Sequence, residues 1–224
     1  MKNNTENGIK EEPKIEEVIK RLKELYPNSG CSLEYENDPW KLLVAARLSA
    51  QCTDARVNIV IKDLFEKFPD ARRMAEADVH DVEEIVKPCG LYRMKAQNIV
   101  DAAGIIVRDF GGKVPNSIEN LLKLPGVGRK IANLILGDVY GIPGIVADTH
   151  CIRINGRLGY YPESLKDPAK VENILAKIVP AEEQTSYCHR IVDFGREWCM
   201  AKSPRCEKCS LGDLCMHNLV NRNT

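Results

Sequence analysis

Four cysteines near the end of the sequence restrict how this part of the chain can fold. Cys199, Cys206, Cys209 and Cys215 are separated by six, two and five residues, whereas the other five of the nine cysteines are scattered. An odd and scattered set does not resemble a disulfide framework, and such a cluster in a protein without a secretion signal indicates a metal site rather than packed free thiols. Both zinc and a 4Fe–4S cluster accept four thiolates, so the spacing leaves the metal open.

The rest of the chain carries a helical pattern that turn signals interrupt. Apolar residues recur at helical spacing, and no alternating run is long enough to demand a strand. The pattern predicts an all-α fold of many short helices with short connections. The expected helices cover residues 15–25, 39–51, 54–68, 71–77, 79–87, 94–110, 117–124, 129–140, 149–158, 168–178 and 181–200.

Length and composition exclude several protein classes. The 224 residues are enough for one to two domains. Lys plus Arg and Asp plus Glu are 32 each, so the whole chain has no charge excess that would attract a polyanion. We find neither a signal sequence nor 18 consecutive apolar residues, so we expect a non-secreted, cytoplasmic protein without membrane contact. Residues 1–12 are polar and are predicted to form a disordered tail.

The sequence LPGVGRK at residues 124–130 lies between two predicted helices. Its glycines allow a tight turn and leave backbone N–H groups uncovered at a helix start, which suits a nucleic-acid phosphate. The same pattern also builds plain turns between helices. Lys130 would stand in the first turn, where the helix dipole opposes a cation and favours an amine nucleophile over an ammonium. A solvated surface lysine is the alternative.

Asp148 precedes another predicted helix, in the sequence DTH at residues 148–150. The common role of such an aspartate is an N-cap, and a cap would also fix the direction of a carboxylate that faces a developing cation. His150 is a candidate acid, base or ligand, although a lone histidine at a helix start is more often structural.

Together these segments resemble the endonuclease III family of helix-hairpin-helix DNA glycosylases over residues 15–217. The resemblance rests on LSAQ at 48–51 with TD at 53–54, GLY at 90–92, LPGVGRK, DTH and the cysteine spacing. It implies a bifunctional glycosylase and abasic-site lyase that excises oxidised pyrimidines from duplex DNA. It also implies a helix-hairpin-helix fold with a six-helix domain at 32–142 and an iron–sulfur domain at 143–224, on which a helix within 13–31 packs. DNA would lie across the cleft between these domains.

The resemblance assigns roles to single residues. Lys130 would attack the sugar C1′ and displace the base, and β-elimination from the Schiff base would then cut the strand. Asp148 would stabilise the positive charge at C1′. Gln51 and Leu91 would fill the space that the extruded nucleotide leaves.

The resemblance also implies the metal centre and further DNA contacts. A 4Fe–4S cluster would be held by Cys199, Cys206, Cys209 and Cys215. Contacts to DNA, made by a monomer, are expected from the hairpin, from the helix start at 148–150 and from the loop between the first two cluster ligands, where phosphate contacts would make binding salt-dependent. These residues are Gly126, Val127, Gly128, Arg129, His150, Lys202 and Arg205.

Three residues depart from the family pattern and leave the preferred damaged base open. Ile131 stands where the family commonly has threonine, and Arg47 places a charge in an apolar helix, where it could face the lesion or extend to solvent. The segment DFG at 193–195, which begins with Asp193, is more similar to the mismatch adenine glycosylases than to typical endonuclease III. These departures leave the expected reaction type intact. A monofunctional mismatch glycosylase for adenine or thymine/uracil, of the same superfamily, is one alternative, which Lys130 disfavours. A non-catalytic DNA-binding module is another, which Lys130 and Asp148 together disfavour.

Overall fold

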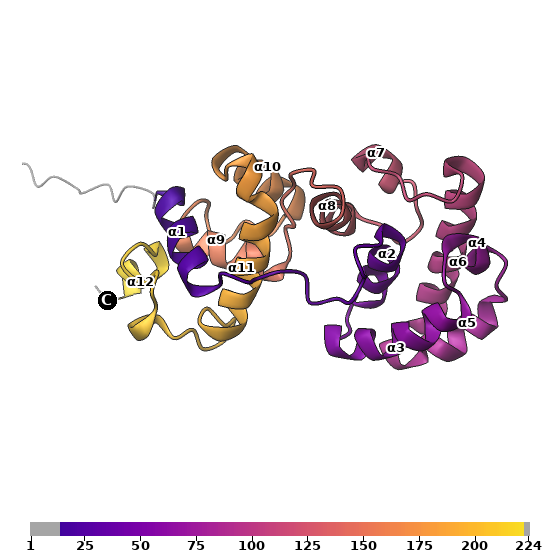
Figure 1. The fold of residues 1–224 in the computed structure, drawn as a ribbon. Helices are drawn as coiled ribbons and strands as arrows, with labels where there is room; N and C mark the ends of the chain where they lie inside the picture. Colours follow the sequence, from indigo (N-terminus) through magenta and orange to yellow (C-terminus); the bar gives the residue numbers. More distant parts are fainter. Residues whose placement is uncertain (1–13, 222–224) are drawn as a thin grey trace, which may run out of the picture. The chain divides into compact units, whose positions relative to one another are not determined.

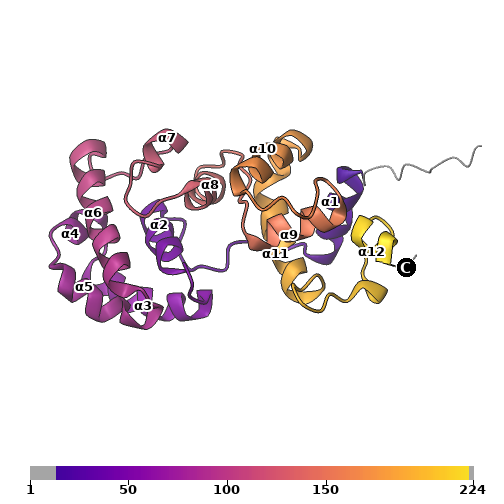
Figure 2. The same cartoon turned by 180° about the vertical axis from the view of Figure 1, so that it is seen from behind.

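The structure, a computed structural model, describes residues 14–221, and Figures 1 and 2 show it from opposite sides. All regular secondary structure in this range is helical, so the predicted all-α class is confirmed. The predicted tail at 1–12 lies outside the described residues. Within 14–221, none of the helices combines the length and the apolar character needed to cross a bilayer.

The chain divides into two compact units. We call residues 30–146 with 180–189 the hairpin unit, and the described residues up to 29 with 147–179 and 190–221 the cluster unit. The sequence predicted domain boundaries between residues 31 and 32 and between residues 142 and 143, and it assigned residues 180–189 to the C-terminal domain. That these parts are separate domains stays a prediction.

The hairpin unit is built from seven α-helices of its own and two 3₁₀ turns within the described residues. These are α2 (Pro39–Leu48), α3 (Asp54–Lys67), α4 (Ala71–Ala75), α5 (Val79–Val86), η1 (Lys87–Cys89), α6 (Tyr92–Phe110), α7 (Ile118–Leu121), α8 (Arg129–Asp138) and η2 (Ala181–Glu183). The long α6 packs against α4 and α5 (Figure 1). Ala96, Ile99, Ala103 and Ile106 recur on its buried face at helical spacing, and the two alanines allow close approach of neighbours.

The cluster unit contains the other helices of the described chain. These are α1 (Ile15–Leu25), α9 (Thr149–Leu158), α10 (Pro168–Ile178), η3 (Cys206–Lys208) and α12 (Met216–Asn221). The helix α11 (Gln184–Glu197) begins in the hairpin unit and continues in the cluster unit. Val18 and Leu22 on α1, Ile154 on α9 and Leu175 on α10 supply buried apolar side chains.

Helix ends explain where the periodic pattern was misleading. The predicted helix 39–51 ends at Leu48, because Ser49 caps it and Gln51 takes a left-handed backbone with φ 56°. The predicted helix 181–200 is a 3₁₀ turn followed by α11, and 117–124 shrinks to α7. The short α12 was not predicted, since its few residues follow a cysteine-rich loop without a clear period.

Candidate active site and metal centre

The LPGVGRK segment folds into a tight turn that delivers the chain to α8. Gly126 has φ +77°, the Val127 N–H donates to the Leu124 carbonyl at 3.1 Å, and Gly128 is the N-cap of α8. The N-cap is a glycine, so the capping residue offers no side-chain acceptor to the first backbone N–H groups of α8. A helix start of this kind suits an anion. Lys130 is the second residue of α8 and is exposed.

Arg47 packs beneath this turn. The side chain is buried, with 8% of the residue exposed, and burial lowers its pKa from the ordinary arginine value. A Cβ on Gly126 would meet the Nε of Arg47 and lie 2.8 Å from its Cδ. The arginine that departs from the family pattern, Arg47, therefore packs against the hairpin turn at Gly126. Ile131, the second departure, is half-buried against the core of the hairpin unit.

This contact makes the two hairpin glycines unequal. Gly126→Ala should lower the free energy of unfolding by about 2 kcal/mol, because the new Cβ is strained at positive φ and collides with Arg47. Gly128→Ala is the matched control: it has φ −96° and open space for a Cβ, so we expect less than about 1 kcal/mol. Urea denaturation of both variants measures this difference, and equal losses would show that Arg47 does not constrain the turn.

Gln51 and Leu91 occupy two loops of the hairpin unit and share an unusual backbone. Both are exposed, with 52% of Leu91 accessible, and both have left-handed φ values of 56° and 47°. Only four non-glycine residues of the described chain have positive φ. Such strain persists only where surrounding structure holds it, and it is common at functional sites.

Asp148 is the N-cap of α9, in the cluster unit. Its carboxylate Oδ1 accepts the Cys151 N–H at 2.7 Å, and the residue is half-buried. His150 lies two residues on, with its Nδ1 3.1 Å from a guanidinium nitrogen of Arg153. Its ring also packs on Gly195, where a Cβ would collide with it. The structure thus gives His150 a packing role, and its predicted DNA contact stays a prediction.

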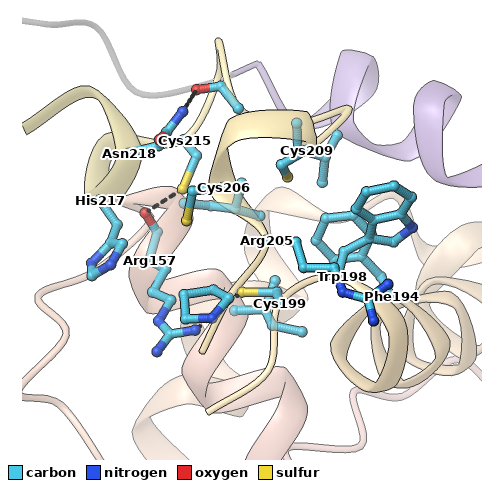
Figure 3. Close-up of a pocket in the computed structure, with 15 residues that line it drawn as sticks. Arg157, Phe194, Trp198, Cys199, Arg205, Cys206, Cys209, Cys215, His217 and Asn218 are labelled. Carbon is cyan, nitrogen blue, oxygen red and sulfur yellow. Dashed lines mark hydrogen bonds between the residues drawn. The ribbon is translucent and has the colours of Figure 1, made fainter. Parts of the chain in front are cut away.

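The four clustered cysteines line one pocket of the cluster unit. Figure 3 shows the sulfur atoms of Cys199, Cys206, Cys209 and Cys215 pointing into this shared space. Apolar side chains including Ile154, Phe194 and Leu211 complete the lining. A hydrophobic shell of this kind limits solvent access to a bound metal group.

The arrangement of the thiols fits an iron–sulfur cube better than a single ion. Among residues 14–221, no three or more His, Cys, Asp or Glu side chains gather closely enough to hold one metal ion. Each iron of a cube takes one thiolate, so its ligands stand further apart than four ligands of one zinc ion. The buried Nε of Arg157 has no hydrogen-bond partner in the described chain, and cluster sulfurs accept hydrogen bonds.

Two arginines of α9, the helix that Asp148 caps, attach the first cysteine of this set to that helix. Arg157 lies 3.3 Å from the Cys199 sulfur and donates to the Met200 and Ala201 carbonyls. Arg153 donates twice to the Cys199 carbonyl, at 3.1 and 2.9 Å. Sequence reasoning missed both residues. Their signal was two arginines four positions apart on one helix, which places them on the same face.

Three further residues that the sequence analysis singled out, Lys202, Arg205 and Asp193, lie in the cluster unit. Lys202 and Arg205 are exposed in the loop between Cys199 and Cys206, and Arg205 also lines the cysteine pocket. Asp193, the third departure, accepts a hydrogen bond from the Ser29 hydroxyl at 2.5 Å, which gives it a structural role.

Comparison with known proteins identifies the family. The model described as "HhH-GPD superfamily base excision DNA repair protein" matches residues 44–181, and "Iron-sulfur binding domain of endonuclease III" matches residues 199–215. Endonuclease III of Synechocystis sp. is 44% identical over 200 residues, covering 89% of this chain and 90% of the relative. The chain belongs to the endonuclease III family. The Bacillus subtilis endonuclease III agrees, with 41% identity over 90% of this chain and 91% of its own length.

Membership in the endonuclease III family defines the activity class. The chain is a bifunctional DNA glycosylase and abasic-site lyase of base excision repair, it binds DNA, and its iron–sulfur domain is of the 4Fe–4S type. A solved structure described as a "Trapped Endonuclease III-DNA Covalent Intermediate: Estranged-Adenine Complex" superposes with a TM-score of 0.87 at 38% identity, covering 93% of this chain and 97% of that chain. The predicted helix-hairpin-helix fold is thereby confirmed.

Proposed function

We propose that Lys130 is the nucleophile of this glycosylase and that oxidised pyrimidines in duplex DNA are its substrates. The Lys130 amine forms a bond to the sugar C1′ while the bond from C1′ to the base breaks, and the base leaves with the bonding electrons. Opening of the sugar ring gives a Schiff base. Loss of a C2′ proton then expels the 3′ phosphate, which is the β-elimination, and water releases the enzyme.

Asp148 is proposed to stabilise the positive charge that develops at C1′. Its role as N-cap of α9 supports this, because the hydrogen bond from the Cys151 N–H fixes the direction of the carboxylate. Cap and catalyst are compatible, since a carboxylate accepts several hydrogen bonds and keeps its charge.

The observation that most supports the proposal is the position of Lys130. It is exposed in the first turn of α8, directly after a glycine turn whose last residue, Gly128, is the N-cap of that helix. A phosphate bound there by Gly126, Val127, Gly128 and Arg129 would place the neighbouring sugar near the amine. The solved relative trapped as a covalent intermediate with DNA supports the same class of chemistry for this chain.

The cysteines are proposed to hold the cluster, and the cluster to shape a DNA-binding loop. Cys199, Cys206, Cys209 and Cys215 would each bind one iron, and the bound cluster would fold the loop that carries Lys202 and Arg205. Both cations would meet DNA phosphates, so affinity should fall as salt rises.

A panel of lesion duplexes tests the proposed substrate and mechanism together. Purified protein is incubated with duplexes that carry thymine glycol, uracil opposite guanine, adenine opposite 8-oxoguanine, or an abasic site, with and without borohydride. We expect base release from thymine glycol, cleavage of the abasic strand, and a borohydride-dependent protein–DNA adduct on both. Release of adenine or uracil without any adduct would instead support a monofunctional mismatch enzyme.

Further proposals concern assembly and location. We propose that the protein acts as a monomer on damaged duplex DNA in the cytoplasm, as expected from the sequence. Light scattering of the free and DNA-bound protein tests the stoichiometry.

A further inference from the structure

Lys95 is a lysine without exposed surface. It lies in the first turns of α6, and its relative exposure is 0%. Its hydrogen-bond partners in the described chain are two backbone carbonyl oxygens, those of Leu48 and Cys89, each 2.8 Å from Nζ. Burial lowers the pKa of Lys95 from the ordinary lysine value. Burying such a group is costly, so a buried lysine with two backbone acceptors calls for a physical reason.

The two carbonyls lie at the ends of two different elements. Leu48 is the last residue of α2, and Cys89 is the last residue of η1. Carbonyls at helix ends lack partners within the helix and favour a cationic donor. One amine group thus joins the C-terminal ends of α2 and η1, at residues 48 and 89, which are 41 residues apart in sequence.

The ends of α2 and η1 each lead directly into one of the loops whose backbone has positive φ, at Gln51 and at Leu91. Gln51 follows Leu48 by three residues, and Leu91 follows Cys89 by two. The side chain of Cys89 is itself buried. Burial, together with the neighbouring thiol of Cys52, raises the pKa of Cys89 to about 11, so this thiol stays protonated near neutral pH. Lys95 therefore joins the bases of the two loops through one buried amine.

We propose that Lys95 is a positioning residue that holds the loops of Gln51 and Leu91 in fixed relation, so that both side chains enter the duplex when a nucleotide is extruded. The inference rests on the proposed function, in which these two residues fill the vacated space. The tip of an exposed loop can push into stacked nucleobases only if the part of the loop that is anchored in the protein does not move back under the load. The hydrogen bonds of Lys95 supply that support from inside the hairpin unit.

The test separates duplex opening from chemistry at the sugar. Lys95→Met keeps length and volume but leaves both carbonyls without their donor. We expect kcat/KM on a thymine glycol duplex to fall about a hundredfold, the scale set by misplacing a positioning group. Cleavage of a single-stranded abasic oligonucleotide, which has no stack to open, should stay within about twofold of wild type, because the reacting groups are untouched.

Controls distinguish positioning from general loss of structure. Lys62→Met removes an exposed lysine of α3 and should leave the rates on both the duplex and the single-stranded substrate unchanged. Hydrogen exchange of the amides at 49–52 and 89–92 should accelerate in Lys95→Met while the amides of α3 and α4 stay protected. Equal loss on both DNA substrates, or an unchanged duplex rate, would overturn the proposal.

Two further outcomes are decisive. If Lys95→Met does not fold, Lys95→Gln, which keeps two N–H donors on a shorter arm, is measured for the same split between substrates. Failure of both variants to fold would assign Lys95 to the core and contradict the proposal. If the wild-type protein releases no base, the proposed function fails, whereas hydrogen exchange at the two loops still decides whether Lys95 holds them together.

Discussion

Lys130→Ala is expected to remove the borohydride-trapped adduct and to lower base release by on the order of 10³-fold or more, because the amine that bonds to C1′ is lost. The free energy of unfolding should change by less than about 0.5 kcal/mol, since Lys130 is exposed at the start of α8. Single-turnover excision and gel analysis of the adduct measure the loss.

Arg129→Ala is the matched control for this substitution. Arg129 is the preceding residue of the same helical turn and is also exposed. Its loss should weaken DNA binding and reduce the slope of log affinity against log salt by about one, while adduct still forms at saturating DNA. Loss of adduct in Arg129→Ala at saturation, or its retention in Lys130→Ala, would show that the reactive amine is elsewhere.

Asp148→Asn is expected to separate the stability role of this residue from its chemical role. Asparagine caps a helix about as well as aspartate, so the hydrogen bond from the Cys151 N–H survives and stability should change by less than about 0.5 kcal/mol. Excision should nevertheless fall about 10²- to 10³-fold, because the charge that faces the developing cation is gone. Urea denaturation and single-turnover kinetics on one preparation measure both quantities.

Two comparisons complete this test. Asp148→Ala also loses the cap and should cost a further ~1 kcal/mol of stability. Asp167→Asn changes the corresponding cap of α10, where the carboxylate accepts from Ala169 and Lys170, and should alter neither stability nor rate. If Asp148→Asn retained wild-type rates, the carboxylate would be only a cap.

The sequence allowed accurate prediction of features that depend on local physics. Thr149–Leu158 and Pro168–Ile178 were predicted to the residue, because each follows a capping aspartate and carries a clear apolar period. The hairpin was predicted for a similar reason, since glycines at fixed positions determine the turn. The family resemblance, confirmed by the comparisons, supplied the activity and the cluster type that spacing alone left open.

Contacts between distant segments could not be read from the sequence. Nothing local indicates that Arg47 lies under Gly126, or that Lys95 is buried between the ends of α2 and η1. A lysine in an amphipathic helix normally faces water, and only tertiary packing places this one inside. Arg153 and Arg157 were likewise missed, because their acceptors lie more than forty residues later.

The central claim is that one amine, that of Lys130, bonds to the sugar of the damaged nucleotide. Mass spectrometry of the borohydride-reduced complex, after digestion of protein and DNA, tests it most directly. The account predicts a sugar remnant on the peptide that contains Lys130, with fragment ions that place it on that side chain. A remnant on another lysine or on the N-terminal amine, or an unmodified Lys130 peptide from a fully trapped complex, would contradict it.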